Sequence, residues 1–230
     1  MMEISSIKDE YEVMPVNAII EDNTIVPGLK GRKIDLDKSY DEMRVGGVFR
    51  EDALVYKDIY PSNTLSNNKD KYIIKGNNNK NKVALLYVLN SNEFEALINL
   101  DNITLFISHN YLTINNINRL KNKEIYTYGN NGIYNDKVLT IDNAIIERAS
   151  KNKSIYCLAK EKNKDILEIC NKKNMYVVLP NIIGTYMEIK NNLSNGSIIL
   201  LNNLNNIQVI TKYINSKGYE IVALSELLEE

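Results

Sequence analysis

The sequence predicts an α/β fold with a parallel sheet for residues 82–230, preceded by a small irregular appendage in residues 1–81. From Lys82 onward, short apolar runs recur with consecutive apolar positions, as in strands that are buried on both faces. Amphipathic stretches of helical period separate these runs. Because strand and helix alternate regularly, we expect a parallel sheet that is either open or closed into a barrel.

The appendage is rich in turn signals and is predicted to contain few strands. One short helix is expected over residues 37–45, with Asp35 or Asp37 as its cap. Residues 75–82 are expected to form a linker or exposed loop, since they combine glycine with a run of asparagines. The turn signals are Pro27-Gly28, Lys30-Gly31, Gly46-Gly47, Tyr60-Pro61-Ser62 and Lys75-Gly76.

The regular part contains seven expected strands and four clear helical faces. The strands are expected at 83–89, 103–108, 124–128, 154–158, 175–179, 197–201 and 219–223. The helical faces are Ile114, Ile117 and Leu120; Ala144, Ile145 and Ala149; Ile166, Leu167, Ile169 and Cys170; and Ile207, Ile210 and Ile214. In folds of this kind the chemistry lies at the carboxyl ends of the strands, so a site is expected there.

Composition narrows the possible functions. The net charge of −1 and the pI near 6.0 give no basic field, which argues against nucleic acid as a partner. Asn, Lys and Ile are frequent, as expected for an A/T-rich genome, so asparagine density alone does not indicate a site. No apolar run approaches the length of a membrane span and no signal segment is present, so membrane attachment would require an anchor outside this sequence.

Histidine and cysteine are scarce. His109 is the one histidine, and we expect it to be a partly exposed loop residue that follows a strand. Cys157 and Cys170 fall in a strand-like and a helix-like run, where we expect them to pack as small apolar side chains rather than to form a disulfide framework. One imidazole cannot supply a zinc site of three or four convergent ligands by itself.

The carboxyl-terminal segment resembles a known family. Residues 196–201 read G-S-I-I-L-L and residues 217–228 read K-G-Y-E-I-V-A-L-S-E-L-L, which is similar to the closing segment of polysaccharide deacetylase (NodB homology) domains. The runs at 103–107 and 123–125 are similar to two further motifs of that family. The resemblance covers residues 82–230 and implies a distorted (β/α) barrel that removes acetyl groups from chitin, peptidoglycan or xylan. It also implies an extracytoplasmic location, in many relatives with a membrane anchor.

Alignment with the family motifs shows that the catalytic and metal-binding positions have changed. The T-F-D-D-G motif, which carries a base aspartate and a metal-binding aspartate, places Val88 and Leu89 at those positions. The H-[ST]-x-x-H metal motif places Tyr128 and Gly132 there. The histidine of the final L-x-H motif is replaced by Asn202. No catalytic residue, metal or other cofactor is therefore expected, because apolar side chains cannot take up a proton or bind a cation and an amide cannot protonate a leaving amine.

Two interpretations remain for the polar and aromatic residues at these strand ends. They have drifted after activity was lost, or they form a retained saccharide-binding groove. Tyr156 enters this set because the family's R-x-P-Y groove motif falls near it, without the arginine and proline. Asp101, Asp136 and Asp142 fall in or beside expected loops, with no pairing that would rebuild a metal site. The candidate saccharide-binding residues are Asn90, Tyr128, Asn130, Asn131, Tyr156 and Asn202.

These observations predict a catalytically inactive polysaccharide deacetylase-like protein that acts as a binding or structural partner in the cell envelope. Its expected partners are cell-wall glycan, above all peptidoglycan, or an envelope protein. Segments within residues 1–81 also resemble those that precede deacetylase domains in low-GC Gram-positive bacteria. One alternative is a carbohydrate deacetylase or other hydrolase with relocated catalytic residues, for instance with Cys157 as nucleophile. Another is that the appendage carries the function and the barrel serves as its mount.

Overall fold

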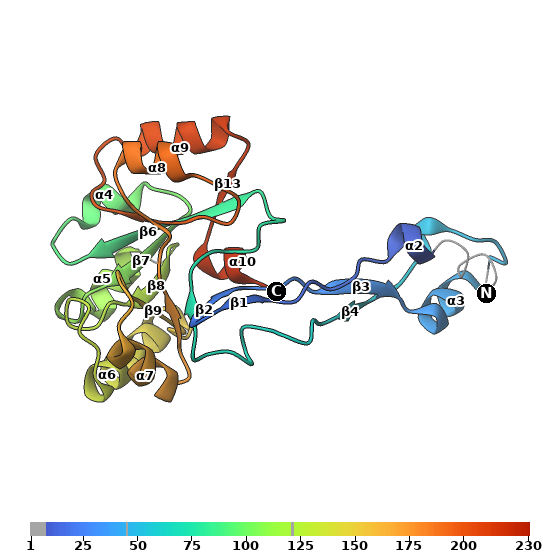
Figure 1. The fold of residues 1–230 in the computed structure, drawn as a ribbon, viewed down its shortest axis with the longest axis horizontal. Helices are drawn as coiled ribbons and strands as arrows, with labels where there is room; N and C mark the ends of the chain where they lie inside the picture. Colours follow the sequence, from blue (N-terminus) through green and yellow to red (C-terminus); the bar gives the residue numbers. More distant parts are fainter. Residues whose placement is uncertain (1–7, 45, 121) are drawn as a thin grey trace.

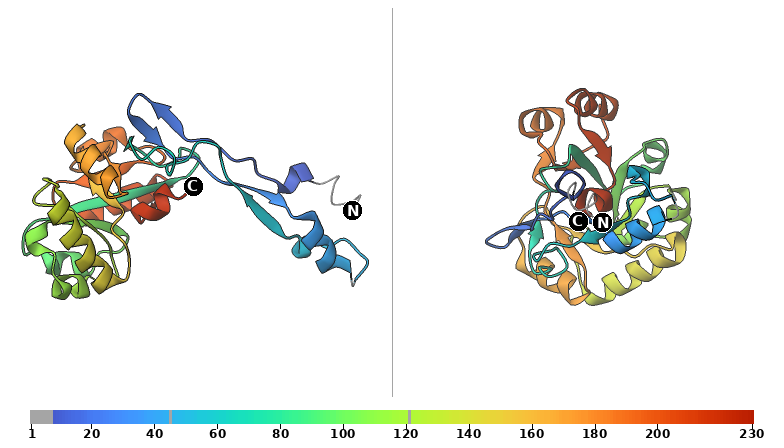
Figure 2. Two further views of the ribbon diagram at one scale, coloured as in Figure 1. Left: turned by 90° about the horizontal axis from the view of Figure 1, so that it is seen from below. Right: turned by 90° about the vertical axis from the view of Figure 1, so that its right-hand side faces the viewer.

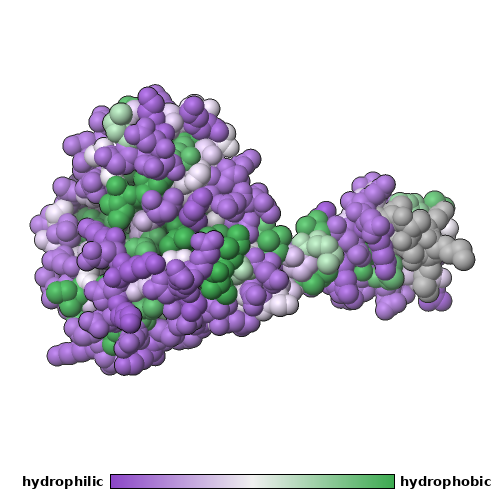
Figure 3. Space-filling model, viewed as in Figure 1, coloured by the Kyte–Doolittle hydropathy of each residue, from purple (hydrophilic) through white to green (hydrophobic). Residues whose placement is uncertain are grey.

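The computed structural model describes residues 8–44, 46–120 and 122–230. They form a rounded α/β body from which a narrow arm projects to one side (Figure 1). The view from below shows the same separation of body and arm, with the C-terminus lying where the two meet (Figure 2, left). On the face shown in Figure 3, hydrophilic residues cover most of the surface, and hydrophobic residues gather in the middle of the body and toward the root of the arm.

The larger sheet has six strands, ordered β11-β12-β6-β7-β8, with β13 beside the amino-terminal half of β6. All of its strand pairs are parallel, as the consecutive apolar positions predict. The strands are β6 (Lys82–Leu89), β7 (Ile103–Ile107), β8 (Glu124–Thr127), β11 (Ile182–Gly184), β12 (Ile198–Leu201) and β13 (Glu220–Val222).

The second sheet has five strands, ordered β1-β2-β5-β10-β9. Its strands are β1 (Ile19–Glu21), β2 (Thr24–Val26), β5 (Tyr72–Ile73), β9 (Tyr156–Leu158) and β10 (Tyr176–Val178). The prediction of few strands before residue 82 was wrong, and the proposed boundary at residue 81 does not separate the two parts, since β5 pairs in parallel with β10. Tyr72 and Ile73 are fully buried, but a two-residue strand leaves no periodic pattern in a sequence.

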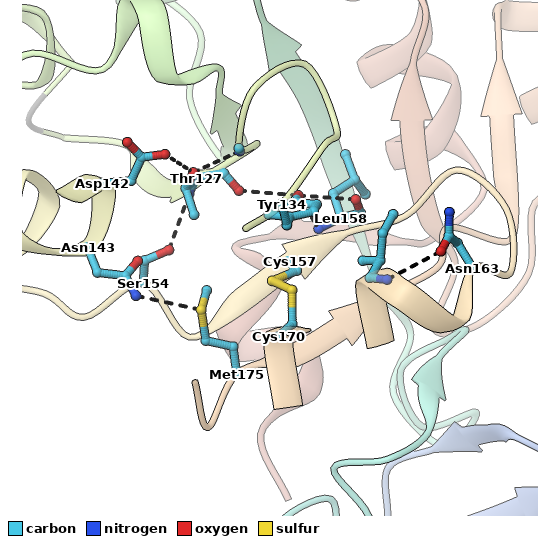
Figure 4. The surroundings of a disulfide bond; sticks show 12 residues. Thr127, Tyr134, Asp142, Asn143, Ser154, Cys157, Leu158, Asn163, Cys170 and Met175 are labelled. Atoms are coloured by element: carbon cyan, nitrogen blue, oxygen red, sulfur yellow. Dashed lines mark hydrogen bonds between the residues drawn. A yellow bond between two sulfur atoms is a disulfide. The ribbon is translucent and has the colours of Figure 1, made fainter. Parts of the chain in front are cut away.

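Side chains join β8 to β9 where the two sheets meet. The hydroxyl of Tyr134 accepts a hydrogen bond from the backbone N–H of Leu158 at 3.0 Å and lies 3.1 Å from its carbonyl oxygen, to which it donates. The same hydroxyl lies 3.5 Å from the carbonyl of Thr127, the last residue of β8. The N–H of Thr127 donates to Ser154 Oγ at 3.2 Å (Figure 4). These contacts link the sheets into the distorted α/β body.

Helices surround the outside of the six-stranded sheet. They are α4 (Phe94–Ile98), α5 (Ile114–Arg119), α6 (Asp136–Ser150), α8 (Tyr186–Asn192) and α9 (Ile207–Ser216), while α10 (Leu224–Leu228) lies at the amino ends of the strands. The helix α7 (Lys164–Lys172) packs instead on β9 and β10 of the second sheet. An outer core between sheet and helices contains Leu85, Leu89, Leu97, Leu105, Ile117 and Ile199. An inner core contains Leu86, Phe106, Tyr126, Tyr156, Leu200 and Leu227. The seven expected strands and four expected helices are confirmed, and the shorter β11, α4 and α8 were not predicted.

Cys157 and Cys170 form a disulfide, so the prediction of two unpaired packing cysteines was wrong. Cys157 lies in β9 and Cys170 in the last turn of α7, and both are fully buried (Figure 4). The sequence placed each cysteine in the correct kind of element. It could not show that α7 packs on β9 with the two side chains facing each other.

The arm is built on a two-stranded antiparallel ribbon of β3 (Gly31–Ile34) and β4 (Tyr56–Ile59). Its end, here called the arm tip, comprises residues 8–12 and 34–54 and contains α2 (Lys8–Tyr11), α3 (Leu36–Arg44) and the 3₁₀ helix η1 (Glu51–Ala53). The helix α3 confirms the one expected over 37–45, apart from residue 45, which lies outside the described residues. Its cap is Asp35, whose Oδ1 accepts a hydrogen bond from the N–H of Lys38 at 3.3 Å. The arm tip has a small core of its own, formed by Ile34, Met43, Ala53 and Leu54.

Buried polar contacts fix the root of the arm to the body. The carboxylate of Glu230 accepts hydrogen bonds from the N–H of Gly28 at 3.0 Å and of Leu65 at 2.9 Å. Asn77 is buried and its side chain donates to the carbonyl of Pro27 at 2.9 Å. The prediction of an exposed linker over 75–82 was therefore wrong in part, because Gly76 and Asn77 pack against the body. Among the described helices, none has the length and apolar character to cross a bilayer.

Candidate functional site

The carboxyl ends of β6, β7, β8 and β12 lie together and form what we call the mouth of the body. Backbone hydrogen bonds hold these strand ends side by side. The N–H of Ser108 donates to the carbonyl of Leu89 at 3.0 Å, and the N–H of Tyr128 donates to the carbonyl of Ile107 at 2.8 Å. The N–H of Asn202, after β12, donates to Gly184 at 3.3 Å. The sequence prediction placed the candidate site at this edge.

Val88 and Leu89, at the end of β6, face opposite sides of the sheet because strand residues alternate. Val88 is half-buried and packs against the inner core, whereas Leu89 is fully buried in the outer core between sheet and helices. Neither side chain offers an oxygen. Leu89 in addition points away from the interior of the body.

Tyr128 and Gly132 occupy the positions of the two histidines in the family's metal motif. Tyr128 is buried, and this burial raises the pKa of its hydroxyl, which keeps it neutral. Lys160, after β9, places its ammonium 5.8 Å from the centre of the Tyr128 ring. Gly132 has φ +86°, and a Cβ at this position would lie 3.0 Å from the Tyr128 hydroxyl. Tyr128 therefore fills the space beside a turn that requires glycine.

Asn90 and Asn202 come together in a hollow of about 540 Å³ at the ends of β6 and β12. The hydroxyl of Tyr87 donates to the Glu93 carboxylate at 2.7 Å at one side of this hollow. Burial, together with the neighbouring Glu93, raises the pKa of Tyr87 to about 12. The residues that line the hollow are Tyr87, Asn90, Ser91, Glu93, Ala96, Asn202, Asn203, Leu204 and Asn205.

The other predicted saccharide residues do not share this hollow. Asn130 and Asn131 are exposed in the turn between β8 and α6, where Asn131 accepts a hydrogen bond from Ser108 Oγ at 2.8 Å. Tyr156 is the first residue of β9 and therefore lies toward the amino ends of the strands. It is 5% exposed and packs between Tyr126, at 5.0 Å between ring centres, and Tyr176, at 5.8 Å. Tyr156 is a core aromatic residue.

His109 forms a contact that the sequence did not predict. Its Nδ1 lies 2.6 Å from Oδ1 of Asp142, which is fully buried in α6. The second oxygen of Asp142 accepts a hydrogen bond from Thr127 Oγ1 at 2.5 Å (Figure 4). The prediction that Asp142 falls in or beside a loop was wrong, because it lies in the middle of α6. A signal was present, since Asp142 shares a helical face with Leu139 and Ile146, both of which are buried.

The pairing with Asp142 leaves Nε2 of His109 as the available nitrogen of a side chain that is 32% exposed. An imidazole held in this way is suited to act as a base if a hydroxyl or water lies within its reach. The neighbouring Ser108 hydroxyl instead donates to Asn131. Cys157 carries no free thiol, since it is bound to Cys170, so the hypothesis of a Cys157 nucleophile does not hold.

A divalent metal, which the family resemblance would imply, does not fit the residues at these positions. Leu89 lies in an apolar core, Tyr128 presents a neutral phenol and Gly132 has no side chain. Across residues 8–44, 46–120 and 122–230, His, Cys, Asp and Glu form no group of three or more that could hold a metal ion. The polar side chains at the mouth carry mainly amide and hydroxyl groups, which suit hydrogen bonding to a neutral polar ligand.

Comparison with solved structures identifies the fold. The wild-type BA3943 protein from Bacillus anthracis, described as a CE4 family pseudoenzyme, superposes with a TM-score of 0.73 at 20% sequence identity, covering 100% of this chain and 94% of that one. The chain has the fold of the family 4 carbohydrate esterases. This confirms the fold that the resemblance to polysaccharide deacetylases predicts. A BA3943 mutant described as having restored enzymatic activity superposes with a TM-score of 0.72, also at 20% identity, covering 100% of this chain and 97% of that one.

Structures of proteins described as enzymes of this fold are also similar. The Bc1960 peptidoglycan N-acetylglucosamine deacetylase superposes with a TM-score of 0.57 at 15% identity, covering 69% of this chain and 95% of that one. PdaA of Bacillus subtilis, a family 4 carbohydrate esterase, gives 0.57 at 11% identity and covers 93% of this chain and 97% of that one. In sequence, the uncharacterized protein YlxY of Bacillus subtilis strain 168 is 28% identical over 261 aligned positions, which cover 96% of this chain and 81% of YlxY. No protein-family model matches the chain.

Proposed function

We propose that the chain is a catalytically inactive polysaccharide deacetylase-like protein that binds cell-wall glycan at its mouth. The observation that carries this proposal is the pair Asn90 and Asn202, which line one hollow at the edge where deacetylases hold their metal and acid residues. The side chains that would activate water are replaced there by Leu89, Tyr128 and Gly132. The likeness of the fold to a protein described as a pseudoenzyme supports the same conclusion.

The chemistry of the hollow suits a neutral sugar. Each asparagine side chain offers two N–H donors and a carbonyl acceptor, which match the hydroxyl and acetamido groups of an N-acetylated saccharide. The hollow of about 540 Å³ lies within the range of small-ligand sites. The Tyr87–Glu93 hydrogen bond holds a carboxylate at its side, which adds one fixed acceptor for a sugar hydroxyl.

We infer that the protein works outside the cytoplasm, in the cell envelope. The Cys157–Cys170 disulfide supports this location, because such bonds persist in oxidising compartments and are rare in the cytosol. Bc1960, which shares the fold, is described as a peptidoglycan deacetylase. Peptidoglycan fragments are therefore the first ligands to test.

The direct experiment is calorimetric titration with N-acetylated chitooligosaccharides and with muropeptides. Replacing Asn90 and Asn202 together by alanine removes two amide side chains from the hollow, and we expect binding to weaken about tenfold or more, since each net hydrogen bond contributes about 0.5–1.5 kcal/mol. Asn118→Ala, an exposed asparagine of α5, is the matched control and should bind normally. Absence of binding by the wild type, or equal losses in both variants, would rule out the proposed site.

A second candidate function is a hydrolase with relocated catalytic residues, and the His109–Asp142 pair is the observation that favours it. An acetate-release assay on the same glycans separates the two candidates. Inactivity of the wild type, with no stoichiometric metal in the purified protein, is expected for the inactive binding protein. Acetate release that is lost in His109→Gln would establish the second candidate instead.

A further inference from the structure

Charge is distributed unevenly between the two ends of the molecule. The arm tip contains four Lys or Arg and nine Asp or Glu, a net charge of −5. Residues 136–174, which run from α6 to the end of α7 and are here called the basic flank, contain nine Lys or Arg and six Asp or Glu, a net charge of +3. The whole chain has a net charge of only −1, so opposite charges are separated along its length.

Several of these charges are exposed and available to a partner. In α3 of the arm tip, Asp37, Asp41 and Glu42 are exposed, and no ion pair involves them among the residues that the structure describes. The same holds for Lys164 and Lys172 of the basic flank within the described chain. Surface charges without a partner in their own chain remain free for steering and pairing with another surface.

The arm tip has the character of a preformed docking element. Its small core of Ile34, Met43, Ala53 and Leu54 holds α3 and η1 together at the end of the β3–β4 ribbon. Val48, 68% exposed, adds an apolar group to the tip. On the basic flank, Ile141 of α6 is 39% exposed and can supply an apolar counterpart.

The arm tip and the basic flank are placed so that, in two copies, each arm tip can contact the basic flank of the other copy. In Figure 1, α3 lies on the lower side of the arm, and α6 and α7 lie on the lower side of the body. The views of Figure 2 agree that α3 and α6 share one side of the molecule. A two-fold rotation about the viewing axis of Figure 1 would turn a second copy so that each arm lies along the other body. Each arm tip then faces the partner's basic flank, and both contacts form at once.

We propose that this protein forms a reciprocal two-fold dimer, in which the acidic arm tip of each copy docks on the basic flank of the other. Such a contact is self-complementary and closed, so assembly stops at two copies. The interface is largely electrostatic, and its strength should therefore fall as salt screens the charges. This proposal does not depend on glycan binding, since the arm tip and the basic flank lie outside the hollow at the mouth.

The test is the molecular mass of the full chain in solution, measured by light scattering and sedimentation. At about 0.05 M salt we expect twice the 26.3 kDa chain mass, and at about 0.5 M salt a shift toward the monomer. Reversing the tip charges with Asp37→Lys, Asp41→Lys and Glu42→Lys should weaken dimerisation at least about tenfold. Reversing the flank charges with Lys137→Glu, Lys164→Glu and Lys172→Glu should have the same effect.

Mixing the two reversed proteins provides the decisive measurement. In a reciprocal pair, the basic tip of one variant meets the acidic flank of the other, and the unchanged tip and flank meet as before, so a heterodimer should form although neither variant dimerises alone. Lys190→Glu with Lys212→Glu, exposed on α8 and α9, is the control and should leave the mass unchanged. Circular dichroism checks that each variant is folded. A wild-type monomer at low salt, a dimer that ignores both reversals, or failure of the mixed pair would each overturn the proposal.

Discussion

The hydroxyl of Tyr134 accepts a hydrogen bond from the backbone N–H of Leu158 and donates one to the carbonyl of the same residue. The Tyr134 side chain thus pairs with both backbone polar groups of Leu158, a buried residue of β9, at the junction of the two sheets. Burial raises the pKa of Tyr134 well above its usual value, so the hydroxyl keeps the proton that this arrangement requires.

Tyr134→Phe should therefore be costly. The substitution leaves the N–H and C=O of Leu158 without their partner, and an unsatisfied buried polar group costs about 1–3 kcal/mol. We expect the free energy of unfolding in urea to fall by roughly 2–4 kcal/mol. Tyr60→Phe, at a tyrosine that is 65% exposed, is the control and should change it by less than about 0.5 kcal/mol. Equal stability of both variants would show that Tyr134 does not join the sheets.

The disulfide between Cys157 and Cys170 predicts a response to reductant. It closes a loop with a sequence separation of 13, for which chain-entropy arguments give a stabilisation of about 3 kcal/mol. Thermal unfolding with dithiothreitol should occur at a lower temperature than without it. The double variant Cys157→Ala and Cys170→Ala should match the reduced protein and ignore the reductant. Two free thiols per chain in the oxidised, unfolded protein would contradict the bond.

Restoring the family's metal residues should fail in this chain. Leu89→Asp would bury a carboxylate in the apolar outer core, at a cost of about 3 kcal/mol or more. Gly132→His would place a side chain at φ +86°, and it fits beside residue 128 only if Tyr128 is also replaced. The fourfold variant combines these two substitutions with Val88→Asp and Tyr128→His. We expect it to unfold at a much lower urea concentration than the wild type and to bind no stoichiometric zinc.

Metal analysis and unfolding of the fourfold variant check this prediction together. Val88→Asp alone serves as the control, since Val88 is only half-buried and its substitution should be tolerated far better than Leu89→Asp. A stable fourfold variant that binds one zinc per chain would mean that β6 can turn Leu89 toward the mouth. The BA3943 mutant described as having restored activity provides a direct comparison for such a chain.

Glu230 should control how firmly the arm root is held. Its carboxylate accepts the N–H groups of Gly28 and Leu65, and hydrogen bonds to charged groups contribute about 1.5–3 kcal/mol each. In Glu230→Ala, hydrogen exchange at these two amides should become roughly tenfold faster or more. Glu229→Ala is the control, because the side chain of Glu229 is exposed and both amides donate to Glu230. Unchanged exchange in both variants would show that other contacts fix the arm.

The body could be predicted from the sequence because its strands are continuous apolar runs that alternate with amphipathic helices. Strand 82–89 is an example of a continuous apolar run, and helix 207–216 is an example of apolar residues at helical spacing. β5 could not be predicted, because two residues show no period and its partner β10 lies about 100 positions away. The disulfide was also missed, because the packing of α7 on β9 brings Cys157 and Cys170 together, and this packing cannot be read from the sequence.

For the candidate site, the rule that parallel strands end at one edge placed Asn90 and Asn202 together correctly. Tyr156 was included because of a motif match, which gave its position in the sequence but not its end of the strand. It is the first residue of β9 and lies away from the mouth. The His109–Asp142 pair was missed because the two residues belong to different elements. A buried aspartate on an apolar helical face was the signal that could have indicated it.

The pairing of β5 with β10 also orders events during synthesis. A ribosome must add roughly one hundred residues after Tyr72 before Val177 and Val178 are available to pair with β5. Until then β5 lacks its neighbour β10, while the arm tip already possesses every residue of its own core. The amino-terminal end of the nascent chain can therefore fold first as a separate head, and the root of the arm closes onto the body late, after the long-range contact has formed.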